Sequence, residues 1–138
     1  MFSPEKLAFI KSRRIAHLAT ADAGGRPHVV PVCFAYLDEA FWIAIDEKPK
    51  TTTRLRRLRN IEENARVTLV FDRYDEDWTR LGYILVTGTA AVLTAGRESE
   101  PALAALRDRY AQYRSMMLEG RPLIRVKPER VTSWGDLR

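Results

Sequence analysis

The side chains of this chain that could do chemistry are concentrated in one short basic stretch. Five cations lie between positions 50 and 59, namely Lys50, Arg54, Arg56, Arg57 and Arg59. The formal net charge of the chain is +5, so an anionic partner is expected to be attracted to it. The stretch has no aromatic residues interleaved for base stacking, which disfavours nucleic acid as that partner. We therefore predict an anion-binding surface here, with a plain solvated helix face as the alternative.

Other residue types that commonly carry chemistry are isolated from one another. Cys33 is the single cysteine, so it forms no intrachain disulfide, and we expect a buried, inert thiol. His17 and His28 supply no zinc-ligand cluster, and we expect both to be half-buried without a catalytic role. The sequence contains no P-loop, GxGxxG, HExxH, GxSxG or paired CxxC pattern. It therefore predicts no metal site and no catalytic residue, and any reactive group must come from elsewhere.

The elements that must position these residues follow from the hydrophobic patterning. Strands are expected at 15–22, 27–37, 41–45, 66–71, 83–93 and 122–134, and helices after Ser3, over 51–64 and from Pro101 towards Met117. Gly88 is expected to mark a bulge, and Pro128 an edge or a bend of the last strand. The elements do not alternate as βαβ units, which disfavours a doubly wound sheet. The sequence therefore predicts an α+β fold, mainly β, with about six mostly antiparallel strands and peripheral helices.

The large aromatic residues are expected to pack within the protein. Trp42 and Trp134 lie in strand-like segments, where large aromatics usually bury their area in a core or an interface. Trp78 directly follows the acidic residues 75–77. We expect it to be a packing residue, and the alternative is a lid over a substrate. The apolar stripe from Leu103 to Met117 is also expected to pack against a core or a partner.

The length and the ends of the sequence predict one domain, 1–138, without a membrane partner. A chain of 138 residues is long enough to bury a core without disulfides or structural metal. The opening residues contain no apolar run of signal-peptide type, and no segment approaches the roughly 20 apolar residues of a membrane span. With its single cysteine, the protein is expected in the reducing environment of the cytoplasm.

Four segments carry a resemblance that covers nearly the whole chain. They are Ile15-Ala16-His17-Leu18-Ala19-Thr20, Gly25-Arg26-Pro27-His28-Val29-Val30-Pro31-Val32, Arg57-Leu58-Arg59-Asn60-Ile61 and Asn64-Ala65-Arg66-Val67. Together they resemble the pyridoxamine 5′-phosphate oxidase-like split-barrel family, in particular its branch of probable coenzyme F-420-dependent enzymes. The resemblance implies an FMN-binding type of split β-barrel that works as a homodimer, with the cofactor in a groove between the two subunits.

The resemblance also implies which residues hold the cofactor. Pro31 and Val32 would contact its ring, and Lys50, Thr51, Arg54 and Arg57 would hold its phosphate through charge-assisted hydrogen bonds. On an ideal helix, positions 50, 54 and 57 project to one side and could converge on one anion. The chain departs from the family where many relatives have lysine at Arg57 and proline at Ala65. The first change keeps the positive charge but alters the geometry of phosphate binding.

The function implied by this resemblance is that of an oxidoreductase. We expect the deazaflavin coenzyme F-420 to exchange a hydride with an unidentified small-molecule substrate, while the protein supplies binding and orientation. A basic groove suits this coenzyme, whose phosphate and oligoglutamate tail carry several negative charges. One alternative is FMN as the cofactor of an oxidase or reductase. Another is a non-catalytic module that binds the coenzyme or a tetrapyrrole.

Overall fold

Seven strands form one antiparallel sheet in the computed structural model, which describes residues 1–45 and 55–138. In chain order the elements are α1 (Pro4–Ser12), β1 (Ala16–Ala21), β2 (Pro27–Val32), β3 (Ala35–Leu37), β4 (Ala40–Ala44), α2 (Arg56–Glu63), β5 (Arg66–Arg73), β6 (Gly82–Thr94), α3 (Glu100–Arg109) and β7 (Pro122–Gly135). Short 3₁₀ helices cover Trp78–Arg80, Arg97–Ser99 and Ala111–Ser115. The mainly β, antiparallel fold predicted from the sequence is confirmed, with one strand more than expected.

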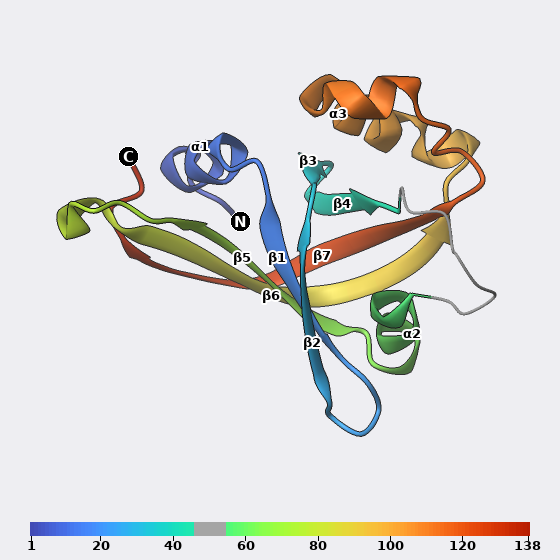
Figure 1. Cartoon of the computed structure of the whole chain (residues 1–138), viewed down its shortest axis with the longest axis horizontal. Coiled ribbons are helices and arrows are strands. Elements are labelled where there is room, and N and C mark those ends of the chain that lie inside the picture. The colour runs from blue at the N-terminus through green and yellow to red at the C-terminus, as the bar shows by residue number, and fades with distance from the viewer. Residues whose placement is uncertain (46–54) are drawn as a thin grey trace.

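The order of the strands shows how the sheet closes. It is β2-β1-β5-β6-β7-β4-β3, so the two edge strands, β2 and β3, are consecutive in the chain and separated by two residues. The sheet must therefore curl until its edges approach each other, which produces a barrel that is open between β2 and β3. In Figure 1, α1 and α3 lie on the same side of the long strands β5, β6 and β7, while α2 packs against β1 and β6.

The additional strand arises from a break within the predicted strand 27–37. At the break, the Phe34 N–H donates to the Tyr110 hydroxyl (3.1 Å), and the Phe34 carbonyl accepts from Arg109 Nε (2.9 Å). Because side chains at the end of α3 engage these backbone groups, Phe34 leaves the ladder and β3 begins on the other side of it. A hydrophobic pattern cannot reveal this break, since Phe34 is buried like a strand residue.

Apolar side chains fill the barrel and a second layer outside it. Inside, the rings of Phe34, Phe41 and Phe71 lie with centroids 5.0–6.2 Å apart. Full burial of a phenylalanine contributes about 1.5–3 kcal/mol. Outside, Leu103 and Leu106 of α3 pack over the part of the sheet that contains β3, β4 and the start of β7. The predicted apolar stripe of this helix therefore packs against the core of its own chain.

The sequence signals predicted the start of the first helix but not the end of the third. As predicted, Ser3 caps α1 by accepting from the Lys6 N–H (3.2 Å), and Pro4 opens the helix. The third helix ends at Arg109 and not near Met117, which is 66% exposed. The chain turns away here because Arg107 donates to the carbonyls of Tyr113 (3.2 Å) and Met116 (2.9 Å), which folds the following segment back over the helix.

The two longest strands are joined across a bulge. The register between β6 and β7 shifts at Thr87 and Gly88, and a Cβ at position 88 would collide with the Lys127 carbonyl oxygen. The predicted bulge at Gly88 is confirmed. Pro128, predicted at an edge or a bend, lies opposite Gly88 and beyond residues 123–126, the part of β7 that pairs with β4. At the proline, β7 therefore pairs with β6 alone, which agrees with the edge interpretation.

Candidate cofactor-binding site

The outer edge of β2 offers backbone groups to a ligand. The β1–β2 ladder continues into the hairpin turn as a hydrogen bond from the Asp22 N–H to the Arg26 carbonyl (3.2 Å). Since the register is regular, the even-numbered residues of β2 bond to β1 and the odd-numbered ones direct their backbone groups away from it. Pro27 and Pro31 are odd-numbered and lack an N–H, so Val29 supplies the one N–H directed outwards by Pro27–Val32. Within the described sheet, nothing pairs with this edge.

The outer face of the same strands is also uncovered. Val29 is 59% exposed, and Pro31 is exposed beside it. Towards the hairpin, the face is hollowed by a cavity of about 470 Å³. Its lining comes from β1, β2, β5, β6 and β7, and includes Ala19, Pro27, Arg66, Thr68, Thr87 and Glu129. The face therefore combines apolar surface at Val29 and Pro31 with a hollow that carries one positive and one negative side chain.

Helix α2 is fixed to the hairpin by two side chains. Asn60, which is 2% exposed, donates from Nδ2 to Thr20 Oγ1 (3.0 Å), and Glu63 accepts from the Ala23 N–H (3.1 Å). At the opposite end of α2, Leu55 provides no side-chain cap, and the positive end of the helix dipole would favour an anion there. The contacts of Asn60 and Glu63 hold α2 against β1 and the hairpin.

The hairpin turn itself is built around a buried carboxylate. Asp22 is 6% exposed and accepts from the N–H groups of Gly24 and Arg26 (2.9 Å each) and from Arg26 Nε (2.8 Å). The Arg26 N–H, followed by its side chain, holds the pKa of Asp22 below its usual range. Next to this turn, a polar hollow of about 270 Å³ is lined by Asp22, Arg26, Arg56, Arg59, Asn60 and Glu63. Arginines therefore surround the junction of hairpin and helix.

The structure places the two predicted ring-contact residues differently. Pro31 is exposed on the outer face, with its carbonyl at the free edge of β2. Val32 is 6% exposed and packs in the barrel core, and its backbone faces β1. Alternation along the strand explains the difference, because neighbouring side chains point to opposite faces.

Of the four predicted phosphate-binding residues, Lys50, Thr51 and Arg54 lie outside the described residues. Arg57 is half-buried in the first turn of α2. The described helix begins after Leu55. The expectation that positions 50, 54 and 57 share one helical face involves two residues outside the described part of the chain, so it stays a prediction.

Strand pairing brings His17 next to Pro31. His17 on β1 is the register partner of Pro31 on β2 and of Val70 on β5. Its Nδ1 lies 4.0 Å from Oδ1 of Asp72, with side-chain exposures of 38% and 58%. His28, by contrast, pairs with Thr20, and its Nδ1 is buried with no hydrogen-bond partner among the described residues. Sequence reasoning gave His17 no role, because its neighbours become visible only once the register is known.

The family assignment can now be made from comparison with known proteins. The family model described as pyridoxamine 5′-phosphate oxidase matches residues 2–135. The chain belongs to this family. A relative in it is the 5a,11a-dehydrotetracycline/5a,11a-dehydrooxytetracycline reductase of Streptomyces rimosus subsp. rimosus. The two are 30% identical over 136 residues, which cover 97% of this chain and 83% of the relative.

Solved structures confirm the split-barrel fold of this pyridoxamine 5′-phosphate oxidase family member. HutZ, the heme storage protein from Vibrio cholerae, superposes with a TM-score of 0.71 at 22% identity, covering 96% of this chain and 93% of its own. An FAD-binding protein from Mesorhizobium loti gives a TM-score of 0.71 at 19% identity, covering 96% and 94%. At these identities, the likeness shows the fold alone. Family membership and the reductase relative support oxidoreductase function at the level of the family.

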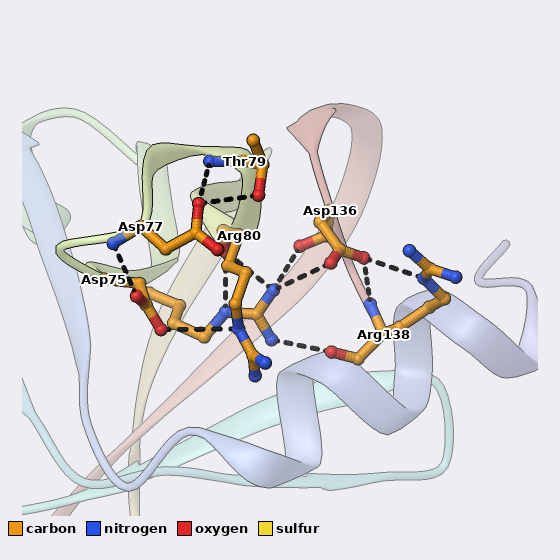
Figure 2. A network of polar contacts seen from close by, with 7 residues as sticks. Asp75, Asp77, Thr79, Arg80, Asp136 and Arg138 are labelled. Carbon is orange, nitrogen blue, oxygen red and sulfur yellow. Dashed lines mark hydrogen bonds and ion pairs between the residues drawn. The ribbon is translucent and has the colours of Figure 1, made fainter.

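The tryptophan in the loop after β5 is not packed as the sequence predicted. As Figure 2 shows, the loop is held by a network of arginine and aspartate side chains that also involves Asp136 and Arg138. Arg73 donates to the carbonyls of Arg80 (2.8 and 2.9 Å) and Asp136 (2.7 Å). Trp78, on this loop, is 70% exposed, so the interpretation as a packing residue is wrong within this chain. Side chain-to-backbone bonds, not the tryptophan, stabilise the loop.

The other tryptophans divide between packing and exposure. Trp42 packs against the cluster under α3 and donates to the Leu37 carbonyl (3.0 Å), as expected of a core residue. Trp134 is 54% exposed and stacks on Tyr83 with ring centroids 6.0 Å apart, so its expected burial in the core is wrong.

In the described part of this family member, no helix is long and apolar enough to cross a membrane. The same residues contain no cluster of three or more potential metal ligands from His, Cys, Asp and Glu.

Proposed function

We propose that the protein is a coenzyme F-420-dependent oxidoreductase that reduces an unsaturated small molecule. The observation that carries this proposal is the free outer edge and face of β2, next to a helix rich in arginine. A relative of 30% identity is named for the reduction of dehydrotetracyclines, compounds with an additional carbon–carbon double bond. An activated double bond is therefore the substrate feature that we assign to this chain.

The edge of β2 fits the ring of a flavin or deazaflavin. Such a ring carries carbonyl and N–H groups on one side, and the Val29 N–H and the carbonyls of Pro27, Val29 and Pro31 are directed outwards to meet them. The exposed side chains of Val29 and Pro31 offer apolar surface to the ring. The bound coenzyme would supply the hydride chemistry, while these residues bind and orient it.

The start of α2 fits the anionic part of the same coenzyme. Arg57 and the positive N-terminal end of the helix would hold the phosphate, together with Lys50, Thr51 and Arg54. The distance between the ring site and the phosphate site can be estimated along β1. Thr20 contacts Asn60 of α2, and His17 pairs with Pro31 of the ring site. These two residues of β1 are three positions apart, or roughly 10 Å at about 3.3 Å per residue. This distance suits a cofactor whose ring and phosphate are joined by a sugar-alcohol chain.

The arginines at the hairpin junction favour the deazaflavin over FMN. Arg26, Arg56 and Arg59 border the polar hollow next to α2, and they exceed the two carboxylates there, Asp22 and Glu63. FMN carries only a phosphate and would leave this excess positive charge without a partner from the cofactor. The oligoglutamate tail of F-420 would form ion pairs with it.

The proposed function includes a cytoplasmic homodimer with the cofactor between its subunits. The uncovered face around β2 supports the dimer, because exposed apolar surface of this kind usually meets a partner. A second subunit placed there would exclude water from the ring. Cys33, the single cysteine, is compatible with a reducing compartment.

The test is a parallel titration of the purified protein with oxidised F-420 and with FMN, followed by cofactor fluorescence at moderate salt. Tight binding of F-420 with weak or no binding of FMN is the expected result. Preference for FMN would indicate that the same site belongs to an FMN-dependent oxidase or reductase. Binding of neither would refute the cofactor site at β2.

Tetrapyrrole binding without catalysis is the second candidate, favoured by the likeness of this fold to a heme storage protein. Titration with hemin separates the two candidates. A strong Soret band together with no affinity for F-420 would select this candidate, and the reductase proposal predicts the opposite.

A further inference from the structure

We propose that His17 is the proton donor of the reduction and that Asp72 positions it. This inference rests on the proposed function. His17 is the cross-strand neighbour of Pro31 and lies on the exposed outer face, where the substrate would meet the ring. His17 is 38% exposed, so its imidazole remains accessible from the groove. The other residues assigned to the ring on this face, Pro31 and Val29, carry no ionisable group.

The chemistry requires such a donor. When a conjugated carbon–carbon double bond is reduced, the carbon remote from the carbonyl gains a hydride from the reduced coenzyme and forms a C–H bond. The electron pair of the double bond moves onto the neighbouring carbon and the carbonyl oxygen. A proton must then neutralise this charge, and it comes from the N–H of the His17 imidazolium. The substrate would gain two hydrogens, the coenzyme would be left oxidised and would release its remaining proton to water, and water would return a proton to His17.

Asp72 is placed to orient the imidazole of His17. Its carboxylate Oδ1 lies 4.0 Å from Nδ1 of His17. With Nδ1 next to Asp72, Nε2 is the ring nitrogen left for the substrate. Arg13 donates to the backbone carbonyl of Asp72 (3.4 Å), and the titratable side chain on the neighbouring strand β6 is Tyr83, the register partner of Asp72. From β2 and β5, the facing residues Pro31 and Val70 are uncharged.

The first experiment places His17 relative to the bound coenzyme without any turnover. The two histidines of the chain give two imidazole Cε1–H signals in NMR, which His17→Gln and His28→Gln assign. Added F-420 should shift the His17 signal and leave the His28 signal nearly unchanged. If F-420 binds but the His17 signal does not move, the proposal for His17 is overturned while the proposed function stands. If F-420 does not bind, both are overturned.

The second experiment measures the proton transfer itself. The probe is 5a,11a-dehydrooxytetracycline with reduced F-420, and rates are recorded across the pH range of about 5 to 8 in which histidines change charge. His17→Gln should lower the rate about 100-fold or more, as expected for loss of a general acid, with an F-420 affinity within about twofold of the wild type. His28→Gln is the matched control and should retain the wild-type rate.

The role of Asp72 is separable from that of His17. Asp72→Asn keeps the shape of the side chain but removes its charge, so it should lower the rate and move the Cε1–H signal of His17 while F-420 affinity stays within about twofold of the wild type. A purely structural role of Asp72 would not move the His17 signal. A His17→Gln variant with the wild-type rate and the wild-type pH profile would overturn the proposal, even if F-420 binds tightly.

Discussion

In the proposed cofactor site, Arg54 and Arg57 are the arginines that we expect to bind the phosphate. Each charge-assisted hydrogen bond that is lost should cost about 1.5–3 kcal/mol of binding free energy. We therefore expect Arg54→Ala and Arg57→Ala, singly and together, to weaken F-420 binding in fluorescence titrations. Arg97→Ala serves as the control, because Arg97 is an exposed arginine on a 3₁₀ helix between β6 and α3. Unchanged affinity in the double variant would remove both residues from the phosphate site.

Glu119 is a residue whose ionisation should be visible in stability. Hydrogen bonds from the Arg107 guanidinium (2.9 and 3.0 Å) lower the pKa of Glu119 to about 2. A carboxylate with a lowered folded-state pKa stabilises the fold above its unfolded pKa of about 4.3, and this contribution is lost as pH falls towards 2. Glu119→Gln should therefore lower the melting temperature at pH 7 and reduce its decline between pH 4.3 and 2.

The size of this effect is limited by solvent, because the Glu119 side chain is 45% exposed. Glu98→Gln, a change of the same type at an exposed position of a short helix, is the control and should leave the melting curve unchanged. Parallel melting curves of Glu119→Gln and wild type at every pH would contradict the assignment of the pair.

For single residues, the sequence predicts which residue types could bind a cofactor better than it predicts which residues lie next to one another. Pro31 could be named from the resemblance, and its exposure agrees with a site residue. Val32 could not be separated from it, since the sequence alone does not say which face of a strand is buried. His17 and Asp72 are 55 positions apart, and only the pairing of β1 with β5 brings them to 4.0 Å.

At the scale of elements, the bulge between β6 and β7 makes the sharpest prediction. Gly88→Ala would place a Cβ against the Lys127 carbonyl oxygen, so the strands must separate locally. We expect a loss of about 1–3 kcal/mol in unfolding free energy, the usual range for overpacking. Urea denaturation measures it. Gly96→Ala is the control, because the nearest atom to a Cβ there lies at 3.9 Å. Equal stability of the two variants would contradict the close approach.

Most elements could be predicted, and the errors share one physical cause. The start of α1 at Ser3 and the bulge at Gly88 depend on local chemistry that the sequence carries. The break at Phe34 and the end of α3 at Arg109 depend on long-range bonds from side chains to backbone carbonyls and N–H groups. Hydrophobic spacing carries no information about such bonds.

For the whole molecule, the testable consequence of the uncovered face is dimerisation. Val29→Asp places a charge on that face, which should convert a dimer of twice 15.9 kDa into a monomer in sedimentation experiments. Met117→Asp is the matched control, because Met117 is similarly exposed, at 66% against 59%, but lies after α3. A wild-type monomer, or two variants that both remain dimers, would refute this face as the interface.

At the same scale, the closure of the barrel could be inferred only as an implication of the family. Composition and patterning predict an antiparallel sheet with helices around it. They do not predict that β2 and β3 form its two edges, since this depends on the pairing of β4 with β7 across 80 residues of chain.

The prolines of β2 also bear on whether the protein stays in solution. A free strand edge is a template on which a strand from another molecule can add, and repeated addition leads to aggregation. Along Pro27–Val32, the two prolines remove two of the three outward N–H positions and leave that of Val29. A small planar ligand needs only a few such groups, whereas an invading strand needs an unbroken row. The edge can thus remain open to a cofactor and still resist the growth of intermolecular sheet.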